Sequence, residues 1–365
     1  MALAQVDPQQ YEVQLHNKVM ALNELLLPFH APAPDIFPSP ATHYRMRAEF
    51  KFWHDHENSY FAMTGDNGET VRVDSFPVAC ERINTLMTVL RAALQSEPML
   101  RRKLFQVEFL ATTTGDAIIS LIYHKPLDDI WQQRASVLQQ KLGCSIIGRS
   151  RGKKIVLGKD HVIENFSIAG ELFSQQQPES AFSQPNAAVN QHMLEWAVSC
   201  CRGPGGDLLE LYCGNGNFTL PLSRHFEKVL ATEVSKTSVN ALQNNVLANQ
   251  CDNISLARLS SEEFTEALNA VRPFRRLAHI NLQDYHFSTV LVDPPRAGLD
   301  DGTLRLLERF ENILYISCNP TTLAQNLQTL CQTHTIQRTA LFDQFPYTHH
   351  MEAGVFLAKK GKRTP

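Results

Sequence analysis

The second half of the chain alternates apolar segments with helical segments, and this alternation restricts the fold more than any other feature. The apolar segments have the length of buried strands, and several of the segments between them are long enough to form helices. Strands are expected at residues 207–212, 228–233, 254–257, 289–293, 312–317, 336–341 and 354–358, and helices at 185–201, 238–250 and 321–331. Repeated β–α units predict an α/β fold with a mostly parallel sheet that binds ligands at the carboxyl ends of its strands.

Strands predominate in the first half, which shows no such alternation. Strands are expected at residues 45–53, 105–110 and 117–123, and helices at 9–27, 80–94 and 129–142. This half is therefore predicted to be a separate α+β domain. A polar segment that contains a proline, residues 175–180, separates the two patterns and is the expected boundary. The predicted domains are residues 1–178 and 179–365.

Length and composition are those of a globular protein of two domains. The chain has 365 residues, of which 43% are hydrophobic. No apolar run approaches the roughly 18 residues that a membrane-spanning helix requires. An acid, Asp7, stands where a signal peptide would extend its apolar core. A cytoplasmic location is expected, and a membrane is not expected as a partner.

The eight cysteines are scattered along the chain. None forms a C-x-x-C pair, and none lies with histidines at the spacing of a zinc site. An iron–sulfur cluster would need several closely spaced thiolates. We therefore predict neither a metal nor an iron–sulfur cluster, and the scatter is typical of a reducing compartment.

The formal net charge of −3 argues mildly against nucleic acid as a partner, but the charge is unevenly distributed. Residues 101–160 contain eleven lysines and arginines against five acids. This excess is compatible with binding a phosphate backbone. The alternative is an ordinary solvated surface, where most lysines and arginines lie.

A glycine pair marks a candidate nucleotide site after the strand at 207–212. Gly214 and Gly216 allow the backbone to approach a ligand closely, and Glu233, at the end of the next strand, could accept both hydroxyls of a ribose. Thr219 replaces the third glycine of the dinucleotide fingerprint, which argues against NAD. The pattern resembles class I S-adenosylmethionine-dependent methyltransferases; the alternative is a tight turn without a ligand.

A candidate nucleophile, Cys318, follows the strand at 312–317. It lies at the predicted carboxyl edge of the sheet, and Pro320 helps to start the next helix, whose N-terminus would favour the thiolate. The alternative role is a small buried hydrophobic residue. Cys213 competes as a nucleophile, but its neighbouring glycines suggest packing beside the ligand loop.

Two further segments carry candidate side chains. Asp293 is followed by two prolines and Arg296, where methyltransferases that act on amino groups have an aromatic residue that stacks on the base. This difference favours a carbon atom as the methyl acceptor. Glu352 directly precedes the last apolar strand and is a candidate general base, with a surface glutamate as the alternative.

Together these segments resemble the RNA uracil-C5 methyltransferases, and the similarity runs through the whole chain. The resemblance rests on Phe182-Ser-Gln184-Pro-Asn186, Asp293-Pro-Pro-Arg296, Ser317-Cys-Asn-Pro320 and Phe345-Pro-Tyr-Thr-His-His-Met-Glu352. Three N-terminal segments, Tyr44-Arg-Met-Arg-Ala-Glu-Phe50, Val73-Asp-Ser-Phe-Pro77 and Tyr123-His-Lys-Pro-Leu-Asp-Asp129, are similar to the tRNA branch of that family. Relatives that act on ribosomal RNA typically add a β-barrel and clustered cysteines.

The resemblance implies methyl transfer from S-adenosylmethionine to carbon 5 of uridine 54 in the tRNA T loop. Cys318 would be the nucleophile that adds to carbon 6, and Glu352 would be the base. The cofactor-contacting positions would be Gln184, Tyr212, Asn217, Glu233 and Asp293. Active-site support is expected from Arg296 and Asn319.

RNA binding is expected from the α+β domain. The expected partner is the T arm of tRNA, with tmRNA as a further candidate, and the enzyme is expected to be a monomer. Phe105 is the candidate stacking residue, with a core side chain as its alternative. Backbone contacts are expected from Arg47, Lys51, Arg101, Arg102, Arg149, Lys153 and Lys154. Two alternatives stay open: the same chemistry on another RNA stem–loop, ribosomal RNA included, and an RNA chaperone that folds tRNA without methylating it.

Overall fold

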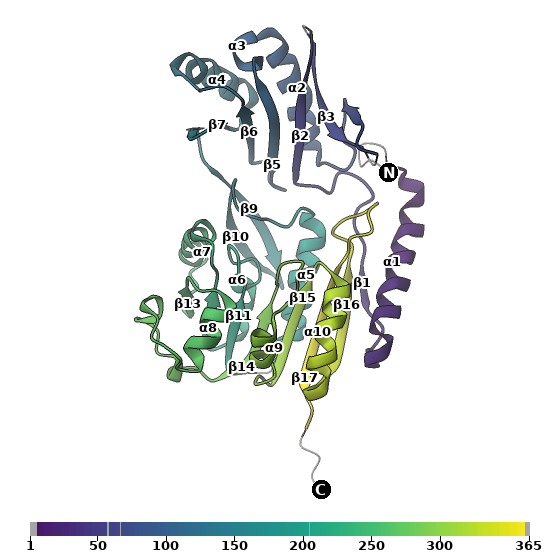
Figure 1. Ribbon diagram of the computed structural model, residues 1–365, viewed down its shortest axis with the longest axis vertical. Helices are drawn as coiled ribbons and strands as arrows, with labels where there is room; N and C mark the ends of the chain where they lie inside the picture. Colours follow the sequence, from purple (N-terminus) through teal and green to yellow (C-terminus); the bar gives the residue numbers. More distant parts are fainter. Residues whose placement is uncertain (1–5, 57, 66, 204, 362–365) are drawn as a thin grey trace. The chain divides into compact units, whose positions relative to one another are not determined.

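The computed structural model describes residues 6–361 except 57, 66 and 204, and it consists of two compact units (Figure 1). As far as it is described, the first unit comprises Met1–Tyr11, Pro40–Asn165 and Gln177–Ala187. The second comprises Glu12–Ser39, Phe166–Gln176 and Ala188–Pro365. The units are therefore interleaved along the chain, which differs from the single boundary after residue 178. The ranges 1–178 and 179–365 remain a prediction as functional domains.

The second unit is built on an eight-stranded sheet that confirms the expected mostly parallel α/β architecture. Its strands, in spatial order, are β1 (Asp35–Phe37), β16 (His334–Phe342), β17 (Glu352–Lys359), β15 (Asn312–Ser317), β14 (Phe287–Val292), β11 (Asp207–Leu211), β12 (Val229–Thr232) and β13 (Ile254–Ala257). All neighbours are parallel except β17, which is antiparallel to both β15 and β16.

Helices pack on both faces of this sheet. They are α1 (Tyr11–Leu26), α5 (Ala187–Cys200), α6 (Thr219–Leu222), α7 (Lys236–Ala248), α8 (Ser261–Leu268), α9 (Asp301–Leu307) and α10 (Pro320–Thr333). Trp196 of α5 packs in one core with Leu314 and Phe342. On the opposite face, the Tyr315 hydroxyl donates to Asn326 Oδ1 of α10 over 2.7 Å. Alternate residues of β15 therefore contact different helix layers, as expected for a mostly apolar strand whose last five residues are buried.

The first unit is an α+β structure, as its predominant strands and accompanying helices predict. Its seven strands, in spatial order, are β4 (Thr70–Val73), β3 (Asn58–Thr64), β2 (Arg47–Asp55), β5 (Leu104–Ala111), β6 (Ala117–Tyr123), β7 (Ser145–Ser150) and β8 (Lys153–Leu157). The helices α2 (Glu81–Ser96), α3 (Pro98–Arg101) and α4 (Asp129–Leu142) accompany them. Phe50, Phe61 and Phe109 form an aromatic cluster across three strands. A Cβ on Gly148 of β7 would meet Trp131 of α4 at 2.2 Å, so this helix lies closely against the sheet.

Most of the polar segment 175–180, the expected boundary, is strand. β9 (His161–Ile168) and β10 (Glu171–Pro178) form a two-stranded sheet, and Gln175 is only 2% exposed. The Asn249 side chain accepts from Ser174 N–H at 2.8 Å and donates to Ser174 O at 2.7 Å. Asn245 Oδ1 accepts from Gln176 N–H at 2.7 Å. Side-chain amides of helix and loop thus satisfy the strand backbone, which explains why a buried strand can be polar here.

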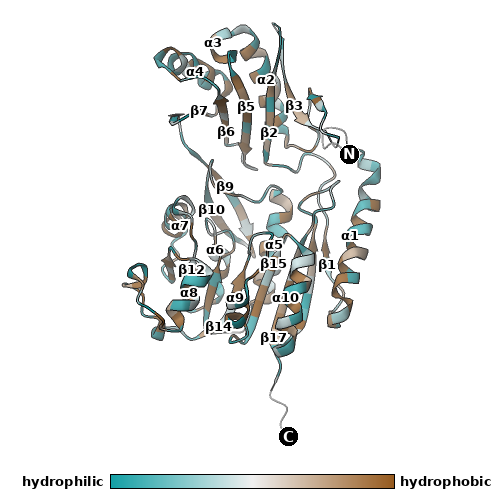
Figure 2. Cartoon of the chain, viewed as in Figure 1, coloured by the Kyte–Doolittle hydropathy of each residue, from teal (hydrophilic) through white to brown (hydrophobic). Residues whose placement is uncertain are grey.

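Hydropathy follows the same layering, with hydrophobic residues concentrated in the central strands and hydrophilic residues on the outer helix surfaces (Figure 2). Among the described residues, none of the helices combines the length and apolar character needed to cross a bilayer.

Gly354 offers a test of the packing between the sheet and α5. A Cβ at this position would meet Trp196 at 2.7 Å and Phe342 at 3.0 Å. We expect Gly354→Ala to lower the free energy of unfolding by about 1–3 kcal/mol, because the core must shift to accept the methyl group. Thermal or urea unfolding measures this change. Gly361→Ala, which meets no atom within 4 Å, is the control, and equal unfolding midpoints for both variants would contradict the packing described.

Candidate active site

Strand register brings the predicted site residues of the second unit to one edge of the sheet. Leu211 is paired with both Thr232 and Val292, so Tyr212, Glu233 and Asp293 follow at equivalent positions after their strands. The cofactor site predicted from the sequence required these three residues to lie at one edge of the sheet, and they do.

Cys318 and Glu352 meet at the same edge because β17 runs antiparallel to β15. The last pair of this ladder joins Ser317 to Ala353, so continuing the register by one residue sets Cys318 opposite Glu352. Glu352 is the first residue of β17 and is 3% exposed, which excludes the alternative of a surface glutamate. Cys318 is half-buried, between the end of β15 and the start of α10.

The glycine loop is shaped as a close-approach turn. Gly214 and Gly216 have φ values of 56° and 92°, in the region that favours glycine. A Cβ on Gly214 would meet no atom within 4 Å, whereas one on Gly216 would meet Leu242 Cδ1 at 2.3 Å. Gly214 therefore leaves open space beside the loop, and Gly216 is needed for packing on α7.

Glu233 is attached to this loop by its carboxylate. Oε2 accepts from Gly214 N–H at 3.1 Å, and Oε1 accepts from Ser235 N–H at 2.7 Å. Asn217 is fixed by two reciprocal amide hydrogen bonds with Asn190 of α5, at 3.0 and 2.8 Å. These contacts hold two of the predicted cofactor positions in fixed orientations.

Tyr212 adopts a strained backbone conformation, with a φ of 61° that non-glycine residues rarely have. Its hydroxyl is hydrogen-bonded to the Ser261 hydroxyl at 2.6 Å. Such strain persists where the surrounding structure imposes it, and it is common at ligand sites.

Asn319 connects the two segments that flank Cys318. Its Oδ1 accepts from Thr321 N–H at 3.2 Å and so caps α10, while its Nδ2 donates to Arg296 O at 3.1 Å. The Arg296 side chain is exposed, and its positive charge lowers the pKa values of Cys318 and Glu352 against larger opposing effects. The supporting roles of both residues stay a prediction.

Three carboxyl groups share this edge of the sheet, of which Glu210 and Glu352 are buried and Asp293 is partly buried. Burial raises the pKa of Asp293 to about 7 and that of Glu210 to about 8. Burial, followed by repulsion from Asp293, raises the pKa of Glu352 well above its usual value. Sequence reasoning missed Glu210, although an acid inside the apolar strand 207–212 was a signal that could have identified it.

The environment of Cys318 differs from the expectation that a helix N-terminus favours its thiolate. Burial, then the charges of Glu352 and Asp293, raises the pKa of the thiol to about 11. The physical reason is that burial and two nearby acids outweigh Arg296 and the backbone. The other candidate, Cys213, is 5% exposed, and burial raises the pKa of its thiol well above the usual value, consistent with a packing role.

The loop and its surroundings fit a nucleoside-containing cation. Besides the open space at Gly214, Oε2 of Glu210 and Oγ1 of Thr219 are buried without a hydrogen-bond partner among the described residues. A set of acids next to a glycine loop suits a ligand with a positive charge and ribose hydroxyls. Fold and site together define a class I S-adenosylmethionine-dependent methyltransferase.

The chain belongs to the tRNA (Uracil-5-)-methyltransferase family, whose family model matches residues 10–360. A tRNA/tmRNA (uracil-C(5))-methyltransferase of Pseudomonas putida (strain W619) is 56% identical and covers 98% of this chain and 99% of its own length. The protein of the same description from Stutzerimonas stutzeri (strain A1501) is 57% identical, with coverages of 99% and 100%.

A solved structure shares the fold. It is the Pyrococcus abyssi tRNA (uracil-54, C5)-methyltransferase in complex with S-adenosyl-L-homocysteine, with a TM-score of 0.74 and 20% identity. The match covers 95% of this chain and 83% of that one. Among the residues that the structure describes here, none of the His, Cys, Asp and Glu side chains gather in a group of three or more that could hold a metal.

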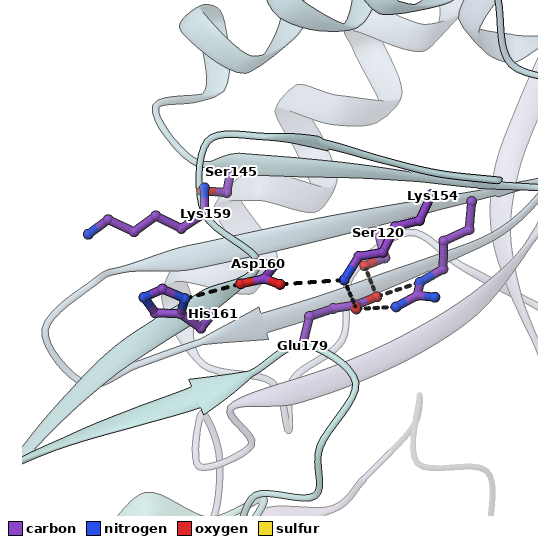
Figure 3. Close-up of polar contacts among 8 residues, drawn as sticks. Ser120, Ser145, Lys154, Lys159, Asp160, His161 and Glu179 are labelled. Atoms are coloured by element: carbon purple, nitrogen blue, oxygen red, sulfur yellow. Dashed lines mark hydrogen bonds and ion pairs between the residues drawn. The ribbon is translucent and has the colours of Figure 1, made fainter. Parts of the chain in front are cut away.

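Three of the predicted RNA-contacting cations converge on Glu179 of the first unit. Figure 3 shows Lys154 and Ser120 beside its carboxylate. Arg149 Nε donates to Glu179 Oε1 at 2.8 Å and its Nη2 forms an ion pair with Oε2. Lys154 Nζ lies 3.6 Å from Oε2, and Arg47 Nη2 donates to the Glu179 carbonyl oxygen at 3.0 Å. The Glu179 carboxylate is buried and also accepts from Ser120. Internal pairing therefore neutralises part of the basic excess.

The remaining N-terminal candidates lie on the surface or at its margin. Phe105 is 39% exposed and stacks on the His124 ring at 4.3 Å, so it is not a core side chain. Lys51 and Lys153 donate to Thr64 Oγ1 and Leu127 O. Arg101 is the last residue of α3, and Arg102, which follows it, is exposed. The cofactor candidate Gln184 belongs to the first unit, and its Oε1 is buried without a hydrogen-bond partner among the described residues.

The charge balance around Cys318 predicts how fast its thiol reacts. In ligand-free protein, Glu352→Gln removes a negative charge and should lower the thiol pKa, whereas Arg296→Gln should raise it. Each pKa unit changes the thiolate fraction about tenfold below the pKa, so at pH 9 the first variant should be alkylated several-fold faster and the second slower. Iodoacetamide labelling with peptide mass spectrometry measures both rates. Cys331 is the internal reference, and identical rates for Cys318 in all three proteins would refute the charge balance.

Proposed function

We propose that this protein methylates carbon 5 of a uridine in RNA, uridine 54 of the tRNA T loop, through a covalent bond from Cys318 to carbon 6. The single observation that carries the proposal is the register that sets Cys318 opposite Glu352 beside a glycine loop. A nucleophile, a buried base and a cation-binding site on one sheet edge are the parts that this reaction needs.

Addition of the Cys318 thiolate forms a bond between sulfur and carbon 6 and moves the ring electrons toward carbon 5 and the neighbouring carbonyl oxygen. Carbon 5 is thereby made nucleophilic. Arg296, whose charge acts on Cys318, can favour the thiolate and stabilise the negative charge of the ring. The high thiol pKa in the ligand-free site keeps Cys318 protonated until positive charge arrives beside it.

Glu352 is assigned to the last step. After methylation, carbon 5 carries a methyl group and a hydrogen. The carboxylate removes this hydrogen as a proton, the electrons restore the double bond between carbons 5 and 6, and the carbon–sulfur bond breaks to release Cys318. Burial raises the pKa of Glu352, which makes its carboxylate a stronger base than an exposed glutamate.

S-adenosylmethionine supplies the methyl group as a sulfonium cation. The residues proposed to hold it are Glu233 for the ribose, Asp293 beside the positive centres, and Tyr212, Asn217 and Gln184 at the other contact positions. Asp293 and Glu210 suit this cation because desolvation raises the pKa values of both, so their ionised forms need a positive partner.

The RNA substrate is proposed from the relatives. Two of them are described as acting on tRNA and tmRNA, and the archaeal protein with the same fold is described as acting on uracil 54 of tRNA. The uridine must leave its stack to reach the sheet edge, which costs a few kcal/mol. The α+β unit would bind the surrounding loop, with Phe105 available for stacking.

The covalent step can be tested with T-arm RNA containing 5-fluorouridine. Fluorine cannot be removed as a proton, so the wild-type enzyme should stop as a denaturant-resistant complex that carries the transferred methyl group. We expect Cys318→Ala to form no complex and Glu352→Gln to accumulate a complex even with unmodified RNA. Denaturing gel electrophoresis with labelled cofactor measures both.

Cys331→Ala is the matched control, because this half-exposed cysteine lies at the other end of α10. A complex formed by Cys318→Ala would remove Cys318 from its role. Comparing T-arm RNA with tmRNA and ribosomal hairpins, followed by mapping of the methylated nucleotide, separates the tRNA proposal from its alternatives.

The first unit can be tested through salt dependence. Arg102 is exposed, so Arg102→Gln should weaken tRNA binding and reduce the slope of log Kd against log salt by about 1. Arg149→Gln should instead lower thermal stability, because it leaves the buried Glu179 with a weaker partner. Binding titrations at several salt concentrations and thermal unfolding measure the two effects. An unchanged slope for Arg102→Gln would exclude this residue from the interface.

A further inference from the structure

A buried ion pair joins the first helix of the chain to the segment that leads into Glu352. Lys18 of α1 is 5% exposed, and its Nζ donates to Asp343 Oδ1 at 2.6 Å. Asp343 is fully buried, and its Oδ2 accepts from Gln14 Nε2 at 2.9 Å. Gln14 and Lys18 are one helical turn apart, so they present two donors from the same face of α1. All of these residues belong to the second unit.

Asp343 occupies a particular place in the strand ladder. Phe342, the last residue of β16, is paired with Glu352, the first residue of β17. Asp343 is therefore the first residue of the nine-residue connection between β16 and β17, and the proposed base, Glu352, directly follows this connection. The ion pair holds this connection at its first residue, next to the pair that contains Glu352.

A chain of hydrogen bonds continues from Lys18 through the connection. Lys18 Nζ also donates to the carbonyl oxygen of Phe345 at 2.8 Å. The same oxygen accepts from the hydroxyl of Thr348 at 2.8 Å, and Thr348 Oγ1 accepts from His350 N–H at 3.2 Å. These bonds reach from α1 to within two residues of Glu352. Tyr347, between them, has a φ of 62°, a strained conformation that needs surrounding contacts to persist.

The carboxyl group of Glu352 depends on its backbone for placement. Its Oε2 has no hydrogen-bond partner among the described residues, so little on the side chain itself fixes its position. We infer that Lys18, with Gln14 and Asp343, is a positioning residue that orients Glu352 for proton removal from carbon 5. This inference rests on the proposed function, in which Glu352 is the base.

The reaction offers a readout that distinguishes positioning from stability. Lys18→Met combined with Asp343→Asn removes both charges and avoids an unpaired buried carboxylate. Methyl transfer needs Cys318 and the cofactor, whereas release of the adduct needs Glu352. We expect the double variant to resolve the methylated adduct about tenfold more slowly, while methyl transfer changes far less, because a small misplacement of a catalytic group is costly. A loss of folded protein would lower both rates together.

Single-turnover kinetics with labelled cofactor and unmodified T-arm RNA measures the two rates. Arg338→Met is the matched control, because Arg338 also joins β16 to the 12–39 segment through an ion pair, with Asp35 at 2.7 Å. Gln14→Met keeps the ion pair and should shift the partition in the same direction by less. Hydrogen exchange should show faster exchange of the amides of residues 344–352 in the double variant and not in Arg338→Met.

The outcomes distinguish a failure of the positioning role of Lys18 from a failure of the proposed role of Glu352 as the base. If Glu352→Gln accumulates adduct and the Lys18 and Gln14 variants do not, the positioning role is refuted and the base assignment stands. If Glu352→Gln resolves its adduct at the wild-type rate, the base assignment fails first. Adduct accumulation in all three, with Arg338→Met unaffected, supports the inference.

Discussion

The antiparallel placement of β17 between β15 and β16 is the constraint on which the proposed chemistry depends. Every other neighbouring pair in the sheet is parallel, so the residues that follow β11, β12, β14 and β15 gather at one edge. A strand that ran parallel would bring its last residue to this edge. Because β17 runs the opposite way, its first residue, Glu352, arrives there and faces Cys318. One reversal of direction thus brings the proposed nucleophile and the proposed base together from distant segments.

Burial determines how these groups behave. Asp293, Glu210 and Glu352 lie in an environment that disfavours their charged forms, and their mutual repulsion reinforces the effect. Burial, followed by the charges of Glu352 and Asp293, raises the pKa of Cys318 to about 11. Without a bound cation, this site disfavours the ionised acids and the Cys318 thiolate, whereas a bound cation stabilises these charged forms. The negative charges of the site therefore suit a positively charged methyl donor. Binding of such a donor would favour formation of the Cys318 thiolate.

Structural features that depend on periodicity and on strand ends could be predicted from the sequence. Features that depend on contacts between residues distant in the chain could not. The strands at 117–123 and 312–317 and the helix at 129–142 agree with the structure, as do the positions of Cys318 and Asp293 at the sheet edge. The strand that includes part of segment 175–180 was not predicted, because Asn245 and Asn249, about seventy residues away, make a polar strand possible. The thiol pKa of Cys318 was misjudged because it depends on Glu352 and Asp293 more than on its own helix.

The pairing of α1 with the end of β16 has a consequence for synthesis of the chain. Lys18 and Asp343 are separated by 325 residues, and β1 pairs with β16 across a similar span. At about 5–20 residues per second, the N-terminal helix waits on the order of tens of seconds for its buried partner to emerge from the ribosome. A polypeptide that terminates before residue 343 therefore lacks the carboxylate that pairs with Lys18, and its α1 is left without this contact.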